Sequence, residues 1–271
     1  MTGPAPVSSD LSGRTLLVTG TTGIAAETVR LATSRGARVG VVGLEAASGS
    51  ALAREVDDAG GECLFFEADV TDPVRVAAVV ESCAAELGRL DALFNVVGIS
   101  GRRFGDGPLH ECTEEGWDRT FESNAKSMFL MCREGLRRML AQEPDGDGLR
   151  GAILNMASVL AFSPAAPLFA THAYAASKGA VIAMSRSAAA YYAPHGIRIN
   201  VIAPGLVRTP MSRRAQESPE TLDYVRRKQP LVNDLLDARD VAATALFLLG
   251  SEARTITGQV LPVDGGWTVS G

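Results

Sequence analysis

Short apolar runs alternate with longer amphipathic stretches along nearly the whole chain. The runs are rich in Val, Ile and Leu, as expected of strands buried on both faces, and the stretches between them carry apolar residues at helical spacing. The pattern predicts strands at 14–20, 37–43, 62–69, 90–98, 151–158, 197–205 and 258–266, with helices at 24–36, 48–61, 74–88, 114–143, 174–194 and 241–251. This alternation is typical of a doubly wound α/β fold, in which a parallel sheet of about seven strands is flanked by helices.

Two segments depart from the alternation. Residues 1–10 are interpreted as a flexible N-terminal tail, and residues 209–230, which are charged and interrupted by prolines, match neither a core helix nor a core strand. The remaining chain shows no internal repeat and no break in composition. We therefore expect residues 11–271 to form a single domain.

Composition narrows the kind of partner. The 271 residues carry 31 acidic and 26 basic side chains, a net charge of −5. A nucleic acid or an anionic membrane surface, which both need basic patches, is therefore not expected as a partner. The first residues lack the basic start and following apolar run that would indicate a secretory signal. Apolar runs such as 241–249 are shorter than a membrane span. We expect a cytoplasmic protein that acts on a small molecule.

The cysteines give no sign of a metal site. Cys63, Cys83, Cys112 and Cys132 are spaced 20, 29 and 20 residues apart, without a CxxC pair. This excludes the usual zinc-ribbon spacing and the disulfide framework of a small secreted domain. We expect reduced thiols and no bound metal.

A glycine-bearing turn connects the first predicted strand to the first predicted helix. It reads TGTTGIA over residues 19–25. Small residues at such a turn let backbone N–H groups and the helix N-terminus approach a pyrophosphate. Small residues also close βα turns for packing reasons alone, so the turn by itself leaves both interpretations open.

A tyrosine and a lysine lie one helical turn apart in YAASK, residues 174–178. A tyrosine hydroxyl has a pKa near 10, and a nearby ammonium lowers that pKa enough for proton exchange with an alcohol or ketone oxygen. An ordinary exposed pair is the alternative. Lys178 is one of only three lysines among 26 basic residues, with Lys126 and Lys228, and Ser158 lies sixteen residues before Tyr174.

Several segments together resemble the classical short-chain dehydrogenase/reductase family. They are TGTTGIA (19–25), ADVTD (68–72), NVVG (95–98), ESNAK (122–126), NMASV (155–159), YAASK (174–178), INVIAPGLVRTPM (199–211) and VDGG (263–266). The resemblance implies a Rossmann-type dinucleotide-binding and catalytic domain, usually homotetrameric or homodimeric. It also implies hydride transfer between NAD(P) and a secondary alcohol or ketone.

The resemblance assigns four catalytic residues. Tyr174 would be the acid/base, and Lys178 would bind the nicotinamide ribose hydroxyls and lower the tyrosine's pKa. Ser158 would hydrogen-bond the substrate oxygen while its charge changes. Asn124 matches the asparagine that holds a water in the proton relay; helix-interior capping or a bent backbone is the alternative reason for an asparagine there.

It also assigns the cofactor-binding positions and a lid. Residues 209–230 become the substrate lid. In addition to Tyr174 and Lys178, the cofactor-binding positions are Gly20, Thr22, Gly23 and Ile24 in the first turn, Asp69 and Val70 as the adenine-binding pair, Asn95 and Gly98 in the cleft, and Pro204, Gly205, Val207 and Thr209 in the loop that grips the nicotinamide carboxamide.

The chain departs from the family pattern at the first turn and at the position that selects the nucleotide. The family's TGxxxGxG is one residue shorter here, and its third glycine is Ala25. An acidic residue after the second strand selects NAD, but the chain has Gly43, Leu44 and then Glu45. Because no Arg or Lys stands at Thr22 or Leu44, we expect NAD in preference to NADP.

The substrate is expected over Ser158 and Tyr174, against a largely apolar wall. The candidates for that wall are Leu160, Phe162, Phe169, Leu206 and Met211; Arg102, Arg103, Arg213, Arg214 and His172 are candidates for a polar contact. Packing or solvated surface is the alternative for each. Two other functions stay open, namely reduction of a C=C or C=N bond on the same fold and non-catalytic dinucleotide binding.

Overall fold

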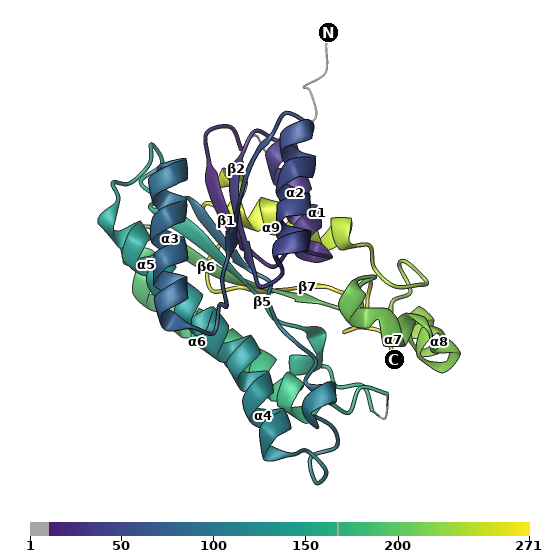
Figure 1. The fold of residues 1–271 in the computed structure, drawn as a ribbon. Helices are drawn as coiled ribbons and strands as arrows, with labels where there is room; N and C mark the ends of the chain where they lie inside the picture. Colours follow the sequence, from purple (N-terminus) through teal and green to yellow (C-terminus); the bar gives the residue numbers. More distant parts are fainter. Residues whose placement is uncertain (1–10, 167) are drawn as a thin grey trace.

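A computed structural model describes residues 11–166 and 168–271, and the tail predicted at residues 1–10 lies outside the described residues. Within the described residues, seven strands form one sheet in the order β3-β2-β1-β4-β5-β6-β7, and every neighbouring pair is parallel. Helices cover both faces (Figure 1). The predicted doubly wound α/β fold is therefore confirmed.

Each predicted strand forms, with shorter ends. The strands are β1 Thr15–Thr19, β2 Arg38–Gly43, β3 Glu62–Glu67, β4 Ala92–Asn95, β5 Gly151–Met156, β6 Ile197–Pro204 and β7 Val260–Val263. The strand order reverses between β1 and β4, where Leu16 pairs with both Val39 and Ala92. Ligands of open α/β sheets bind outside the carboxyl ends of the strands at such a reversal.

Six helices form the two outer layers. The helices α1 Ile24–Ser34, α2 Ala46–Asp58 and α9 Ala238–Leu249 cover one face, and α3 Pro73–Leu87, α5 Ser127–Ala141 and α6 His172–Tyr192 cover the other. Each face of the sheet has its own hydrophobic core. Successive side chains of β1 point to opposite faces, so Leu16 and Val18 pack in one core and Leu17 in the other. Both faces of the sheet are thus buried.

The helix predicted at 114–143 is interrupted. It consists of α4 Glu114–Phe121, a wider π-helical turn over Glu122–Lys126, and α5. A π turn holds one extra residue, which a pattern of apolar residues at helical spacing does not reveal. Here the extra residue falls around the buried Asn124, whose side chain bonds outside the helix.

Residues 209–230 are more regular than predicted. They form a 3-10 turn at Pro210–Ser212, the short helix α7 Arg213–Gln216 and the helix α8 Pro219–Lys228. The Ser218 side chain accepts a hydrogen bond from the Thr221 backbone N–H and so caps α8. Figure 1 shows α7 and α8 beside the carboxyl end of the sheet, after β6. This local capping stabilises a surface helix where the apolar pattern is weak.

The described residues hold neither a membrane-spanning helix nor a metal cluster. None of their helices is both long enough and apolar enough to cross a bilayer. No group of three or more His, Cys, Asp or Glu among them could hold a metal ion. The four cysteines are free, and burial raises the thiol pKa of Cys63, Cys83 and Cys132 to about 12.

Candidate active site

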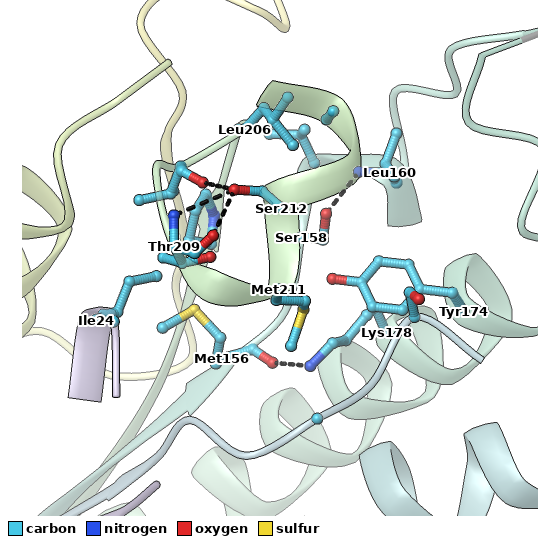
Figure 2. A pocket seen from close by; sticks show the side chains of 18 of the residues that line it. Ile24, Met156, Ser158, Leu160, Tyr174, Lys178, Leu206, Thr209, Met211 and Ser212 are labelled. Carbon is cyan, nitrogen blue, oxygen red and sulfur yellow. Dashed lines mark hydrogen bonds between the residues drawn. The ribbon is translucent and has the colours of Figure 1, made fainter. Parts of the chain in front are cut away.

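One cleft lies at the carboxyl ends of the strands and collects most of the predicted site residues. Its volume is about 250 Å³ (Figure 2). The predicted residues that line it are Thr22, Gly23, Ile24, Gly98, Ser158, Tyr174, Lys178, Pro204, Gly205, Val207 and Thr209. They come from loops that are far apart in the sequence. The loops meet because the strands of a parallel sheet all have their carboxyl ends at the same edge.

Ser158, Tyr174 and Lys178 meet at the floor of this cleft. Ser158 follows β5, and its Oγ accepts a hydrogen bond from the Leu160 backbone N–H at 3.2 Å. Tyr174 and Lys178 are one turn apart on α6, and the Tyr174 hydroxyl faces Ser158 (Figure 2). The Ser158 hydroxyl acts on Tyr174 as a hydrogen-bonding group that lowers the tyrosine's pKa. The hydroxyls thus form a pair that can exchange a proton with a bound oxygen.

The tyrosine's surroundings raise its pKa. Burial disfavours the phenolate and raises the pKa of Tyr174, and the hydrogen bond from Ser158 offsets only part of this rise. Lys178, whose Nζ lies 5.8 Å from the centroid of the ring and donates to the Met156 carbonyl, does not contribute to this shift in the protein alone, so the lowering of the tyrosine's pKa by Lys178 stays a prediction for the complex with the cofactor. In the protein alone, Tyr174 is a phenol at neutral pH and is poised to donate a proton.

Lys178 is the buried lysine of the site. Its Nζ donates to the Met156 carbonyl at 2.8 Å (Figure 2), and burial lowers its pKa to about 7. The other two lysines lie outside the cleft lining and have structural roles. Lys126 pairs with Glu122 at 3.1 Å, and Lys228 donates to the Ser270 carbonyl at 2.6 Å.

Asn124 lies behind Lys178 and is fully buried. Its Oδ1 accepts from the Ile99 N–H at 2.7 Å, and its Nδ2 donates to the Ile99 carbonyl at 3.1 Å and to Ser177 Oγ at 2.9 Å. A Cβ on Gly98 would lie 2.8 Å from Asn124 Oδ1 and 3.2 Å from Lys178 Nζ. The asparagine therefore fixes the loop after β4 against α6, within a bent helix.

Four predicted cofactor-binding residues do not line the cleft: Gly20, Asp69, Val70 and Asn95. Asn95 is buried, and its Nδ2 donates to Asn155 Oδ1 at 2.8 Å, which joins β4 to β5. Asp69 is exposed after β3 and accepts hydrogen bonds from the N–H and hydroxyl of Thr71. The Asn95 side chain thus braces the sheet rather than facing the cleft.

The donors around the cleft fit a dinucleotide. α1 begins at Ile24 without a side-chain cap, so its first N–H groups and the positive end of its dipole are left for an anion. A Cβ on Gly23 would lie 3.0 Å from Thr209 Cγ2, so the first turn and the loop after β6 approach closely. Lys178 uses one of its three N–H donors on Met156. The others suit ribose hydroxyls.

Asp106 supports the site and has no signal in the sequence pattern. It lies in the loop after β4, is buried, and accepts hydrogen bonds from the backbone N–H groups of Ala173 and Tyr174, both at 3.0 Å. The N-cap residue of α6, Thr171, provides no such bond. Asp106 therefore caps the helix that carries Tyr174 from a position 67 residues away in the chain.

Gln229 and Trp267 were also missed at the sequence level. Buried Gln229 accepts from the Leu206 N–H at 2.6 Å and donates to the Leu206 carbonyl at 3.2 Å, which fixes the loop after β6 to the end of α8. Trp267 lines the cleft and packs edge-on against Phe169 and Tyr224, with ring centroids 5.8 and 5.7 Å apart. Only the tertiary structure joins these segments.

The apolar wall forms largely as predicted. Leu160, Phe169, Leu206 and Met211 line the cleft, together with Met156 and Trp267. Phe162 does not line it and is 46% exposed. Of the polar candidates, Arg102 and Arg214 line the cleft, whereas Arg103, Arg213 and His172 do not.

A parallel sheet of this order, with a serine, a tyrosine and a lysine in the cleft at its carboxyl end, defines an oxidoreductase of the Rossmann type. The family model described as enoyl-(acyl carrier protein) reductase matches residues 18–268. The chain belongs to the short-chain dehydrogenase/reductase family. It is an oxidoreductase of that family, whose members typically use NAD(P).

Individual relatives are similar over nearly their whole length. The cis-4-hydroxycyclohexanecarboxylate dehydrogenase of Sinomonas cyclohexanicum is 36% identical over 94% of this chain and 96% of its own. The 2,5-dichloro-2,5-cyclohexadiene-1,4-diol dehydrogenase of Sphingobium indicum is 34% identical over 96% and 99%. A short-chain type dehydrogenase/reductase from Mycobacterium ulcerans superposes with a TM-score of 0.87 at 28% identity, covering 96% of this chain and 91% of that one.

Proposed function

We propose that this protein is an NAD-dependent dehydrogenase that oxidises a secondary alcohol on a small carbocyclic ring, with Tyr174 as the acid/base. The observation that carries the proposal is the Ser158–Tyr174 hydroxyl pair beside Lys178 in an apolar cleft. The dehydrogenases from Sinomonas cyclohexanicum and Sphingobium indicum, which are named for six-membered ring alcohols, support the ring.

The residues divide the proton chemistry between them. Ser158 Oγ holds the substrate oxygen, and the Tyr174 hydroxyl takes its proton in oxidation or returns it in reduction. NAD, when bound, supplies the hydride acceptor. Lys178 holds the ribose hydroxyls with its free N–H donors and, when charged, stabilises the phenolate. Met156, Leu160 and the other apolar residues exclude water from the reacting carbon.

The preference for NAD rests on the edge of the cleft after β2. A Cβ on Gly43 would lie 2.9 Å from Thr21 Cγ2, so Thr21 fills the place where an acidic side chain would begin. Glu45 is exposed and is the one charged side chain among residues 43–48. A 2′-phosphate would find a carboxylate rather than a cation nearby, which disfavours NADP.

A cofactor and substrate panel tests the proposal. We expect calorimetric titration to give a Kd for NADH at least about tenfold below that for NADPH. Cyclohexanol derivatives with NAD should give turnover that is followed as NADH absorbance. Reduction of a C=C or C=N bond without alcohol oxidation, or tight NADH binding without turnover, would contradict the assignment.

We further propose a homotetramer assembled through α4, α5 and α6. These helices expose large apolar side chains, namely Trp117 at 38%, Phe129 at 46%, Leu140 at 40% and Tyr191 at 68%. Large apolar side chains exposed on such helices are typical of subunit contacts. Light scattering should give a mass close to four times 28.4 kDa, and a monomeric mass would contradict the proposal.

A further inference from the structure

The cleft is positively charged although the protein is acidic. Arg102, Lys178 and Arg214 line it, and no Asp or Glu of residues 11–166 and 168–271 does so. The whole chain has a net charge of −5. Lys178 is accounted for by the proposed ribose contacts, which leaves two guanidinium groups without a role.

Arg102 is held firmly at the wall of the cleft. It begins a 3-10 turn, Arg102–Phe104, between Gly101 at φ 73° and Gly105 at φ 100°, both left-handed conformations that favour glycine. A Cβ on either glycine would collide with a threonine hydroxyl. The half-buried Arg102 donates one hydrogen bond, from Nη2 to the Leu168 carbonyl at 3.1 Å. Its remaining donors have no hydrogen-bond partner among residues 11–166 and 168–271 and can meet a ligand.

Arg102 and Arg214 are close enough to repel each other. Burial lowers the pKa of Arg102 most, the charge of Arg214 lowers it further, and Asp106 raises it. The Asp106 carboxylate already accepts hydrogen bonds from α6. Within the described part of the chain, neither guanidinium forms an ion pair. Two like charges facing one cleft would be relieved by an anion.

The position of Arg102 separates it from the phosphate-binding turn. Arg102 bonds to Leu168, next to Phe169 on the apolar wall, and its loop caps the helix that carries Tyr174. Arg214 lies in α7 on the lid side. The pyrophosphate end, by contrast, is at Ile24 and the start of α1. Arg102 therefore lies at the substrate end of the cleft, and Arg214 is near enough for its charge to act on Arg102.

We propose that Arg102 and Arg214 together bind a carboxylate on the substrate, so that the physiological alcohol is a cyclic hydroxy acid. A guanidinium donates two parallel hydrogen bonds to a carboxylate, and such charge-assisted bonds are stronger than neutral ones. The apolar wall then covers the ring while Ser158 and Tyr174 hold the hydroxyl. This inference rests on the proposed function, because it assigns the charge of the alcohol that Tyr174 oxidises.

Matched acids and amides test the inference. The substrates are the 3- and 4-hydroxycyclohexanecarboxylates and the corresponding carboxamides, which have nearly the same shape and differ in charge. We expect kcat/KM to be at least about tenfold higher for the best acid than for its amide. Raising the salt concentration should reduce that ratio, since it screens the partly exposed arginines.

Variants assign the preference to the two arginines. Arg102→Gln and Arg214→Gln should each lower kcat/KM for the acid about tenfold, chiefly through KM, and leave the amide within about twofold. Arg103→Gln and Arg213→Gln are matched controls, because these neighbours do not line the cleft. Arg103 instead lies over the Phe104 ring, 4.6 Å from its centroid. Both controls should keep the preference of the unchanged enzyme.

Two outcomes would overturn the inference. One is an acid preference that survives in the Arg102→Gln/Arg214→Gln double variant, and the other is loss of NADH affinity in place of acid affinity, which would assign the arginines to the cofactor. Calorimetry of the NADH complex with cyclohexanecarboxylate and cyclohexanecarboxamide gives a readout without turnover. Turnover of amides with no acid preference overturns only this inference, whereas acid-selective binding with no turnover of any alcohol overturns only the proposed function.

Discussion

Replacing Tyr174 with Phe is expected to lower kcat for alcohol oxidation by about 10²–10⁴-fold, the usual contribution of a positioned acid/base. The ring still fills its half-buried place, and only the hydroxyl that faces Ser158 is lost. Because α6 and Lys178 are left unchanged, the Kd for NADH should stay within about threefold of the unchanged enzyme. Steady-state rates and a fluorescence titration with NADH measure the two quantities.

The matched control is Tyr191→Phe, which removes the same atom from a residue of the same helix that is 68% exposed. It should leave kcat unchanged. The pH profile gives a second check, since burial raises the pKa of Tyr174 and oxidation needs the phenolate. Oxidation should therefore become faster from neutral to alkaline pH. Near-normal turnover by Tyr174→Phe would refute the assignment of the acid/base.

Replacing Lys178 with Met is expected to lower kcat by about 10²-fold or more and to weaken NADH binding about tenfold, since it removes the ammonium and its ribose contacts. Lys178→Arg should not restore activity. The Nζ donates to the Met156 carbonyl at 2.8 Å, and a planar guanidinium replaces a compact ammonium poorly in that contact. Kinetics and calorimetry of both variants measure this.

The same lysine should make folding stability depend on pH. Its pKa falls from a usual 10.5 to about 7 on folding, because burial penalises the ammonium. Between these values the unfolded chain holds more protons than the folded one, so the free energy of unfolding rises with pH, by at most about 1.4 kcal/mol per pH unit. The penalty is fully present below pH 7 and absent above 10.5.

In the Lys178→Met variant, the free energy of unfolding loses this part of its increase with pH. Denaturant unfolding of the variant and the unchanged protein at several pH values would measure the difference. Lys126→Met is the control, since that lysine is partly exposed and pairs with Glu122 on the surface. Equal pH dependence of unfolding in Lys178→Met and the unchanged protein would contradict the buried, pKa-shifted state of Lys178.

The fold could be predicted from the chain alone because both kinds of element leave a local pattern. Runs such as LLV in β1 and IRINVIAP in β6 are buried throughout, and the stretches between them repeat at helical spacing. The YAASK spacing likewise fixes Tyr174 and Lys178 one turn apart on any helix. The π turn at Glu122–Lys126 could not be predicted, since one extra residue in a turn leaves the apolar pattern nearly unchanged.

The pattern of apolar and polar residues could not predict the direction of individual side chains or their partners from distant parts of the chain. Asn95 falls in a segment typical of a cofactor cleft, yet its amide turns to Asn155 inside the sheet. Asp106 is an ordinary loop acid until the fold brings it to the start of α6. The scarcity of lysine among the basic residues drew attention to Lys178. Only the structure shows that this lysine is buried, with its Nζ bonded to the Met156 carbonyl, and that burial lowers its pKa.

The sequence by itself determined the βα alternation, the single parallel sheet and the residue types of the site, because each depends on neighbours along the chain. The tertiary structure alone decided which of those residues share one cleft and what charge that cleft carries. Arg102 and Arg214 are 112 positions apart, and nothing local distinguishes them from Arg103 and Arg213. Their repulsion across the cleft arises only when the loop after β4 and the helix α7 are brought to the same edge of the sheet.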